Sequence, residues 1–144
     1  MGFSVLADPR QVYDRIRAAG YSHAQACGIL GNIQQESAFR CAVEGYDGTG
    51  SYGLCQWLGS RKKALQAFAK AQERPMCDPM TQVEFMLHEL QHNERQAGRL
   101  LGQCTTAAGA AWCFSRWYER PSKSAACNEK RASYAERYAE RFGP

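Results

Sequence analysis

The stretch SHAQACGILGNIQQES, residues 22–37, predicts a helix that ends on a single carboxylate, Glu36. Ser22 followed three residues later by Gln25 resembles a capping box, in which two side chains and two backbone amides pair at a helix start. The apolar residues of the stretch recur at the spacing of one helical face, which we expect to be buried: Ala26, Ile29, Leu30 and Ile33.

The position of Glu36 in the last predicted turn favours a carboxyl that keeps its proton. A helix C-terminus carries a partial negative charge, which disfavours an ionised carboxylate. Burial beside the apolar face acts in the same direction and raises the pKa further. A carboxylic acid that is still protonated near neutral pH is what a general acid requires, so Glu36 is the first candidate for catalysis.

Helical patterns fill most of the remaining chain. Proline signals predict helices that begin after Asp8 and after Asp78, and one that stops at Pro121. Further helices are expected from about Ser60 to Arg74, from Thr105 or Thr106 onward, and from Ser124 to the end. Residues 41–57 are rich in glycine and lack a helical period, which predicts a small β-hairpin. The expected fold is α+β and mostly helical, with about six helices and this hairpin.

Length and composition fit one soluble globular domain. The chain has 144 residues, of which 44% are hydrophobic and 22% charged. Its formal charge of +4 suits an anionic partner, but the basic residues are interspersed with acids, which disfavours nucleic-acid binding. The first ten residues lack the pattern of a signal peptide, and no window is apolar enough to predict a membrane span.

Cysteine usage leaves two interpretations open. The seven cysteines include no pair at C-x-x-C spacing, so a zinc ribbon or a thioredoxin-like motif has no support. Because the number is odd, at least one thiol is unpaired within the chain. Either the cysteines pack as small buried hydrophobes, or some of them form disulfides.

A second carboxylate and several aromatic residues follow Glu36 in the glycine-rich segment. Glycoside hydrolysis commonly uses one acid and a second carboxylate that activates water. Glu44 and Asp47 are the candidates for that second group. The same segment carries flat apolar side chains on which a sugar ring can rest, and an amide that can bond a sugar: Tyr46, Tyr52, Trp57 and Gln56.

The motifs GILGNIQQESAF, SYGLCQW and GSRKKAL, in this order, resemble the phage tail lysozyme family. The resemblance continues through VEFMLHEL and FSRWYERP and covers roughly residues 22 to 140. The Glu-Ser pair and the Gly-Leu-x-Gln stretch are also shared with goose-type lysozymes and lytic transglycosylases. This resemblance implies a single lysozyme-like catalytic domain over residues 1–144, with a cleft between the helix end and the hairpin.

The resemblance also implies residue roles. Glu36 corresponds to the catalytic acid, and Ser37 to the serine that supports it. Asp47 stands six residues before Gly53, as an Asp does in goose-type lysozymes, and is therefore the candidate base. The position of a second goose-type Asp holds Leu58, which disfavours an arrangement with two aspartates. Residues expected to contact or support the bound glycan are Ser37, Tyr52, Gln56, Trp57 and Tyr118.

The implied reaction is hydrolysis of the β-1,4 bond between N-acetylmuramic acid and N-acetylglucosamine in peptidoglycan. A lytic transglycosylase, in which the sugar's own 6-hydroxyl attacks, remains the alternative. The partner would be the glycan strand; we expect no cofactor, no nucleic acid, no membrane insertion, and a monomer. The expected enzyme is an endolysin, made in the host cytoplasm and acting on the periplasmic cell wall, with carriage in the virion as the other route.

Residues 88–92 read HELQH, which matches the zinc-binding pattern H-E-x-x-H of metallopeptidases. In that motif both histidines face a cleft and bind the metal while the Glu acts as base. Helical spacing instead places His88 and His92 roughly opposite the apolar stripe of Val83, Met86, Leu87 and Leu90, on the solvent side. A zinc peptidase with His88, Glu89 and His92 is therefore the alternative from another class.

A third hypothesis is a lysozyme-like domain that binds glycans without cleaving them. Arg61 and the WYERP run at 117–121 would then contact acidic sugars. The ordinary alternatives are a surface charge for Arg61 and an ion pair for Glu119. Because both Glu36 and Asp47 are present, we favour the catalytic interpretation.

Overall fold

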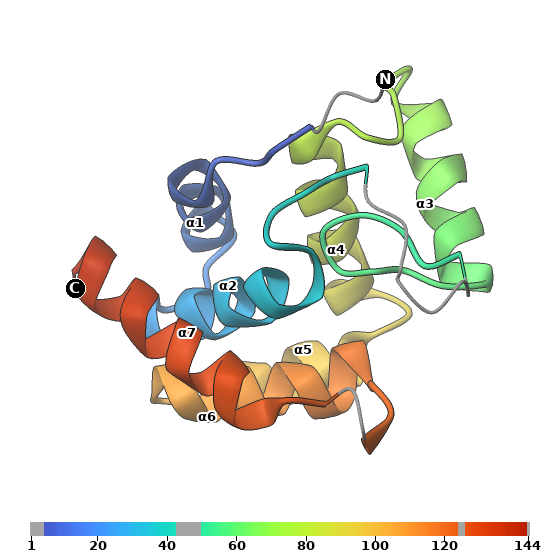
Figure 1. The fold of residues 1–144 in the computed structure, drawn as a ribbon. Coiled ribbons are helices and arrows are strands. Elements are labelled where there is room, and N and C mark those ends of the chain that lie inside the picture. The colour runs from blue at the N-terminus through green and yellow to red at the C-terminus, as the bar shows by residue number, and fades with distance from the viewer. Residues whose placement is uncertain (1–4, 43–49, 124–125, 144) are drawn as a thin grey trace.

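The computed structural model describes residues 5–42, 50–123 and 126–143 (Figure 1). Helix α2 crosses the middle of the molecule, with α1 and α4 on one side of it and α6 and α7 on the other. The described residues form these helices: α1 (Pro9–Ala18), α2 (His23–Ser37), α3 (Ser60–Ala71), α4 (Pro79–Gln91), α5 (Arg95–Leu101), α6 (Ala107–Phe114), the π-helical turn η1 (Ser115–Glu119) and α7 (Asn128–Phe142).

The predicted starts of four helices agree with the structure, whereas the last helix, predicted from Ser124, begins at Asn128. Asp8 and Asp78 cap α1 and α4, each followed by a proline at the first turn. The capping box at Ser22 and Gln25 is present in both directions. Thr106 caps α6 through a bond from the backbone N–H of Gly109. Local side-chain chemistry at helix starts is therefore readable from the sequence alone.

Helix α5 was not predicted. It has only seven residues and contains Gly98, which lowers its intrinsic helix propensity. A Cβ on Gly98 would lie 2.2 Å from the backbone oxygen of Leu90, so the glycine lets α5 approach α4 closely. This helix depends on its contact with α4, and the hydrophobic pattern of the sequence does not predict such a tertiary contact.

The β-hairpin predicted for residues 41–57 is not seen in the described part of that segment. A single antiparallel bridge joins Tyr52 to Trp57 and closes a tight loop, in which Gln56 adopts a left-handed φ of 54°. Three consecutive residues inside the loop are buried: Gly53, Leu54 and Cys55. In a half-buried strand, buried and exposed side chains would alternate instead. Residues 43–49 lie outside the described residues.

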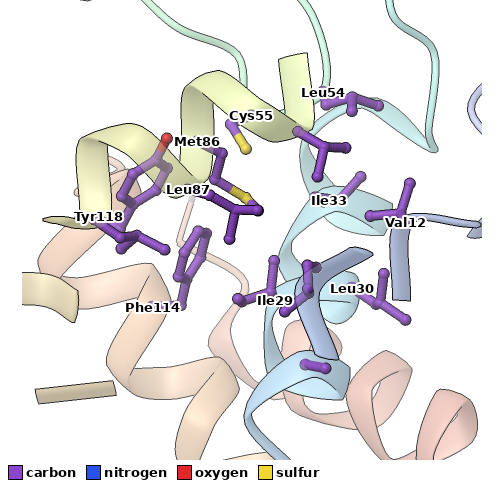
Figure 2. Close-up of a cluster of buried hydrophobic side chains, with 14 of the residues drawn as sticks. Val12, Ile29, Leu30, Ile33, Leu54, Cys55, Met86, Leu87, Phe114 and Tyr118 are labelled. Carbon is purple, nitrogen blue, oxygen red and sulfur yellow. The ribbon is translucent and has the colours of Figure 1, made fainter. Parts of the chain in front are cut away.

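The core joins side chains from both sides of α2 (Figure 2). Apolar residues of α2 meet those of α4, the end of α6 with η1, and the loop before α3. Figure 2 labels the main contributors: Val12, Ile29, Leu30, Ile33, Leu54, Cys55, Met86, Leu87, Phe114 and Tyr118. The loop at 50–57 is thus part of the core. None of the helices in the described ranges is long and apolar enough to cross a membrane.

Close contact between α2 and α6 depends on Gly28. A Cβ there would lie 2.4 Å from the Cβ of Ala110 and 2.7 Å from the backbone nitrogen of Ala111. We expect Gly28→Ala to lower the free energy of unfolding by roughly 1–3 kcal/mol, because overpacking forces backbone shifts. Urea denaturation measures this, with Gly102→Ala as the control, where φ is −61° and the nearest atom would lie at 3.4 Å. Equal stability of the two variants would contradict the prediction.

Candidate active site

Glu36 lies in the last turn of α2, where the chain changes direction. Ala38 and Phe39 both adopt left-handed backbone conformations, with φ of 52° and 65°. The backbone N–H of Ala38 donates to the carbonyl of Gln34 and closes the helix. The Glu36 side chain is 17% exposed, so its carboxyl is largely withdrawn from water but still reachable from solvent.

Arg131 of α7 holds the Glu36 carboxyl. Its Nη1 lies 2.8 Å from Glu36 Oε2, and its side chain is only 1% exposed. The same nitrogen donates to Asn32 Oδ1 at 2.9 Å, and Nε donates to the carbonyl of Ala126. Buried ion pairs are tolerated when further hydrogen bonds satisfy the buried donors, and here Nη1 and Nε both have such bonds. Arg131 of α7 therefore fixes the position of the Glu36 carboxyl.

Asn32 completes this network inside α2. Its Nδ2 donates to the carbonyl of Gly28 at 2.9 Å and to the carbonyl of Ala111 at 3.0 Å, which leaves Oδ1 for Arg131. Asn32 lies one turn before Glu36 on the helix and is completely buried. Three helices thus contribute to the placement of one carboxyl.

The pKa of Glu36 lies above its ordinary value. Burial is the largest cause, and the charge and hydrogen bond of Arg131 oppose it. The direction is the one that the sequence predicted from burial. Burial favours the protonated carboxyl relative to an ordinary glutamate, and the guanidinium gives the ionised form a buried counterion. This combination suits a general acid, which must both hold a proton and release it.

Glu119, at the end of η1, is a second acid in the same electrostatic cluster. Its Oε2 is buried and has no hydrogen-bond partner among the described residues. The pKa of this carboxyl is raised well above the ordinary value, first by burial and next by the negative charge of Glu36, while Arg131 and Arg61 oppose the rise. The turn that carries it is π-helical, a form often found at functional sites.

We expect Glu119→Gln to stabilise the protein increasingly as pH rises from about 4.5, the ordinary pKa of this carboxyl. In the folded state Glu119 keeps its proton above the pH at which the unfolded chain loses it. Its favourable contribution is thus complete below 4.5 and is lost as pH rises through the folded pKa. The slope is at most about 1.4 kcal/mol per pH unit.

Chemical denaturation of both proteins from pH 4 to 9 measures this difference. Glu140→Gln, at an exposed position of α7, is the matched control and should show no such trend. A stability difference between wild type and Glu119→Gln that is independent of pH would refute the assignment of a protonated Glu119.

Glu89 forms the centre of a second buried network. Its Oε1 accepts hydrogen bonds from Trp57 Nε1 at 3.0 Å and from the Tyr118 hydroxyl at 2.6 Å. Arg61 donates to both carboxylate oxygens, from Nη2 to Oε1 at 2.9 Å and from Nε to Oε2 at 3.0 Å. Arg61 Nη1 also donates to the Tyr118 carbonyl. This network ties the 50–57 loop, α3, α4 and η1 together.

The predicted substrate contacts of Trp57 and Tyr118 are therefore corrected. Trp57 is 1% exposed and Tyr118 is fully buried, with its ring stacked on Phe114 at 4.3 Å. Neither ring presents a face on which a sugar can rest. The predicted surface or glycan-binding role of Arg61 is corrected in the same way, since its guanidinium is engaged by Glu89.

Ser37, Tyr52 and Gln56 each have contacts in or next to the 50–57 loop. Ser37 Oγ donates to the carbonyl of Leu54 at 2.9 Å, which joins the end of α2 to the loop. Gln56 accepts from Ser51 Oγ at 2.9 Å and donates to the carbonyl of Gly53 at 3.0 Å. Tyr52 is half-buried, under the ammonium of Lys62. Ser37 is thus a support of the loop, whereas Tyr52 and Gln56 remain partly accessible.

The remaining predicted acids and one aromatic lie outside the described residues. These are Glu44, Tyr46 and Asp47. The role of Asp47 as base therefore stays a prediction.

The three residues of the H-E-x-x-H motif do not share one face. His88 and His92 are exposed, as the sequence predicted, and their rings stack at 4.0 Å. Glu89 is 4% exposed, and its carboxylate is bonded to Trp57, Tyr118 and Arg61. The carboxylate that would serve as base in a peptidase is therefore part of the folded core.

Sequence reasoning missed Arg131, although a signal was present. Arg131, Ala135 and Tyr138 follow one another at helical spacing, and all three are buried. An arginine on the inner face of an otherwise apolar stripe requires a buried partner. That requirement, combined with a carboxylate at the end of another helix, indicates the ion pair.

Comparison with known families gives one match. The sequence profile described as phage tail lysozyme matches residues 8–142, nearly the whole chain. The chain belongs to the phage tail lysozyme family. Membership implies a lysozyme-like enzyme that degrades peptidoglycan, and it confirms the resemblance carried by the Glu-Ser and Gly-Leu-x-Gln motifs. No curated protein matches the sequence.

Proposed function

We propose that this lysozyme family member hydrolyses the β-1,4 bond between N-acetylmuramic acid and N-acetylglucosamine, with Glu36 as the general acid. The observation that carries the proposal is the Glu36 carboxyl itself. It lies at the end of the central helix, largely buried, with a raised pKa and a buried guanidinium 2.8 Å from its oxygen.

The reaction would proceed in two linked proton steps. The protonated carboxyl of Glu36 donates to the bridging oxygen, and the C1–O bond breaks. Arg131 then stabilises the Glu36 carboxylate that remains, which reduces the free-energy cost of proton release inside the protein. A carboxylate on the opposite face of the sugar activates water, and Asp47 is the candidate for that base. Water adds to C1, and its proton passes to the base.

Asp47→Asn distinguishes hydrolysis from transglycosylation. A base that activates water contributes about 10²–10⁴-fold, so we expect a loss of that size for a hydrolase. In a lytic transglycosylase the 6-hydroxyl of N-acetylmuramic acid attacks instead, and the loss should be mild. Turnover is measured on purified murein, with Asp14→Asn, at an exposed position of α1, as the control.

Mass spectrometry of the digested murein shows which bond is cleaved and whether the cleavage is hydrolysis or transglycosylation. Reducing N-acetylmuramic acid ends are expected from the proposed hydrolase. Anhydro ends would establish the transglycosylase, and cleaved peptide stems with intact glycans would overturn both. A protein that binds murein without releasing any fragment would support the non-catalytic hypothesis.

The proposed setting is an endolysin that reaches the cell wall after synthesis in the host, with a virion-borne enzyme as the alternative. The formal charge of +4 would assist contact with an anionic envelope. Because such attraction is screened, association should weaken with added salt.

A further inference from the structure

Two thiols, those of Cys104 and Cys113, lie together where α5 leads into α6. Cys104 Sγ lies 3.5 Å from the carbonyl oxygen of Leu100 and 3.8 Å from that of Gly109. Gly109 is one helical turn before Cys113, and a helical side chain leans over the turn that precedes it. The two thiols are accordingly hydrogen-bond partners.

The backbone on each side of this pair is already held in place. Gln25 Nε2 donates to the carbonyls of Gly102 at 3.1 Å and Cys104 at 3.0 Å. Cys113 lies within α6. Both cysteines are partly exposed, so a small molecule can reach them. The two thiols are therefore accessible, and they already lie within hydrogen-bond reach of each other.

We propose that Cys104 and Cys113 are a covalent modification site, which forms an intramolecular disulfide on contact with a small disulfide donor such as oxidised glutathione. One thiolate attacks the donor, so that a mixed disulfide forms and one donor thiol leaves. The second thiolate attacks the protein sulfur of that mixed disulfide and releases the other donor thiol. Both cysteines lose a proton, the protein loses two electrons, and the donor is reduced to two thiols.

A different observation carries a second pair, Cys41 and Cys77. Gln82 Nε2 donates to the carbonyl of Cys41 at 2.7 Å and to that of Met76, the neighbour of Cys77, at 2.9 Å. One buried amide thus holds both segments together. Cys77 is partly exposed and can attack the donor, and Cys41, which is buried, can then resolve the mixed disulfide. Because Cys77 is also near enough to Cys41 to raise the pKa of its thiol, the same donor chemistry should yield a Cys41–Cys77 disulfide.

The rate at which both disulfides form should rise with pH. Burial raises the pKa of Cys113 to about 12, and the adjacent Cys104 adds to the shift. Burial likewise raises the pKa of Cys41 to about 12, with Cys77 and Asp78 contributing and a backbone hydrogen bond from Ala7 opposing. Because the thiolate is the nucleophile, oxidation should be slow at neutral pH and faster in mildly alkaline buffer.

Peptide mapping of the full chain tests the pairing. The protein is incubated with mixtures of oxidised and reduced glutathione, quenched with acid, unfolded, alkylated and digested for mass spectrometry. The expected result is a 104–113 link and a 41–77 link, with the buried Cys27 and Cys55 alkylated and the exposed Cys127 in no protein disulfide, either alkylated or carrying a glutathione adduct. Alkylated Cys104 and Cys113 under oxidising conditions, or links in other combinations, would overturn the proposal.

Single substitutions provide the matched controls. Cys113→Ser should lose only the 104–113 link and retain a glutathione adduct on Cys104, whereas Cys127→Ser should leave both links intact. Oxidised wild type should melt at a higher temperature than reduced protein, and the 41–77 link should contribute more because it closes the longer loop. A disulfide between Cys104 and any other cysteine of the chain in Cys113→Ser would contradict the assignment. These measurements do not depend on the proposed role of Glu36.

Discussion

Glu36→Gln is expected to lower turnover on purified peptidoglycan by about 10²–10⁴-fold, the usual contribution of a general acid. Glutamine has nearly the same shape, and its amide oxygen can accept the hydrogen bond of Arg131 Nη1 that Glu36 Oε2 now accepts at 2.8 Å. The fold should therefore persist while the proton donor is lost. Release of soluble muropeptides measures the effect, and near-ultraviolet circular dichroism checks the fold.

The pH dependence of the wild-type enzyme provides a second test of the same proton. The pKa of Glu36 is raised, so the protonated fraction falls as pH rises through that value, and activity should fall with it on the alkaline side. Glu136→Gln, at an exposed position of α7, should keep both the rate and this profile. Full turnover by Glu36→Gln would falsify the assignment of the acid.

The parts of the fold that the sequence predicts correctly are those fixed by local chemistry. Asp8, Ser22, Asp78 and Thr106 each cap a helix with their own side chain, and that preference depends on a few neighbouring residues. The position of Glu36 in the last turn of α2 could be predicted for the same reason, since the helix limits follow from local sequence.

The parts that were missed depend on contacts between distant segments. Trp57 is followed by an exposed Leu58 and preceded by glycines, which is typical of a surface loop, yet its indole bonds Glu89 of α4. The burial of Leu54 and Cys55 has the same origin. A hairpin was predicted for residues 41–57 because this glycine-rich sequence lacks a helical period. In the structure, the 50–57 loop packs against α2 and α4 and forms a buried turn instead.

The H-E-x-x-H match shows why a short motif needs its structural context. Its spacing is compatible with zinc ligation on a helix, but the environment assigns the glutamate to the core and the histidines to the surface. The difference lies in the partners of Glu89: the hydroxyl of Tyr118, the indole of Trp57 and the guanidinium of Arg61, which are distant in sequence.

Arg131→Met should have the largest effect on stability, lowering the free energy of unfolding by about 3–5 kcal/mol. Methionine has a similar length, so most of the packing of α7 on α2 is kept. The substitution removes the donors to Asn32 Oδ1 and the Ala126 carbonyl, and it leaves the Glu36 carboxyl without its counterion. Arg137→Met, exposed on the same helix, is the control and should be near neutral.

The pH dependence of this loss separates the charge from the packing. Without the guanidinium, the pKa of Glu36 should rise further, because Arg131 is what opposes the effect of burial. The destabilisation should consequently be smaller at pH 4, where Glu36 is protonated in both proteins, than at pH 8. Adding Glu36→Gln to Arg131→Met should recover part of the loss at pH 8, since no carboxylate is then buried alone. An Arg131→Met loss that is the same at both pH values would mean that Arg131 stabilises the fold through packing and hydrogen bonds, without acting on the proton of Glu36.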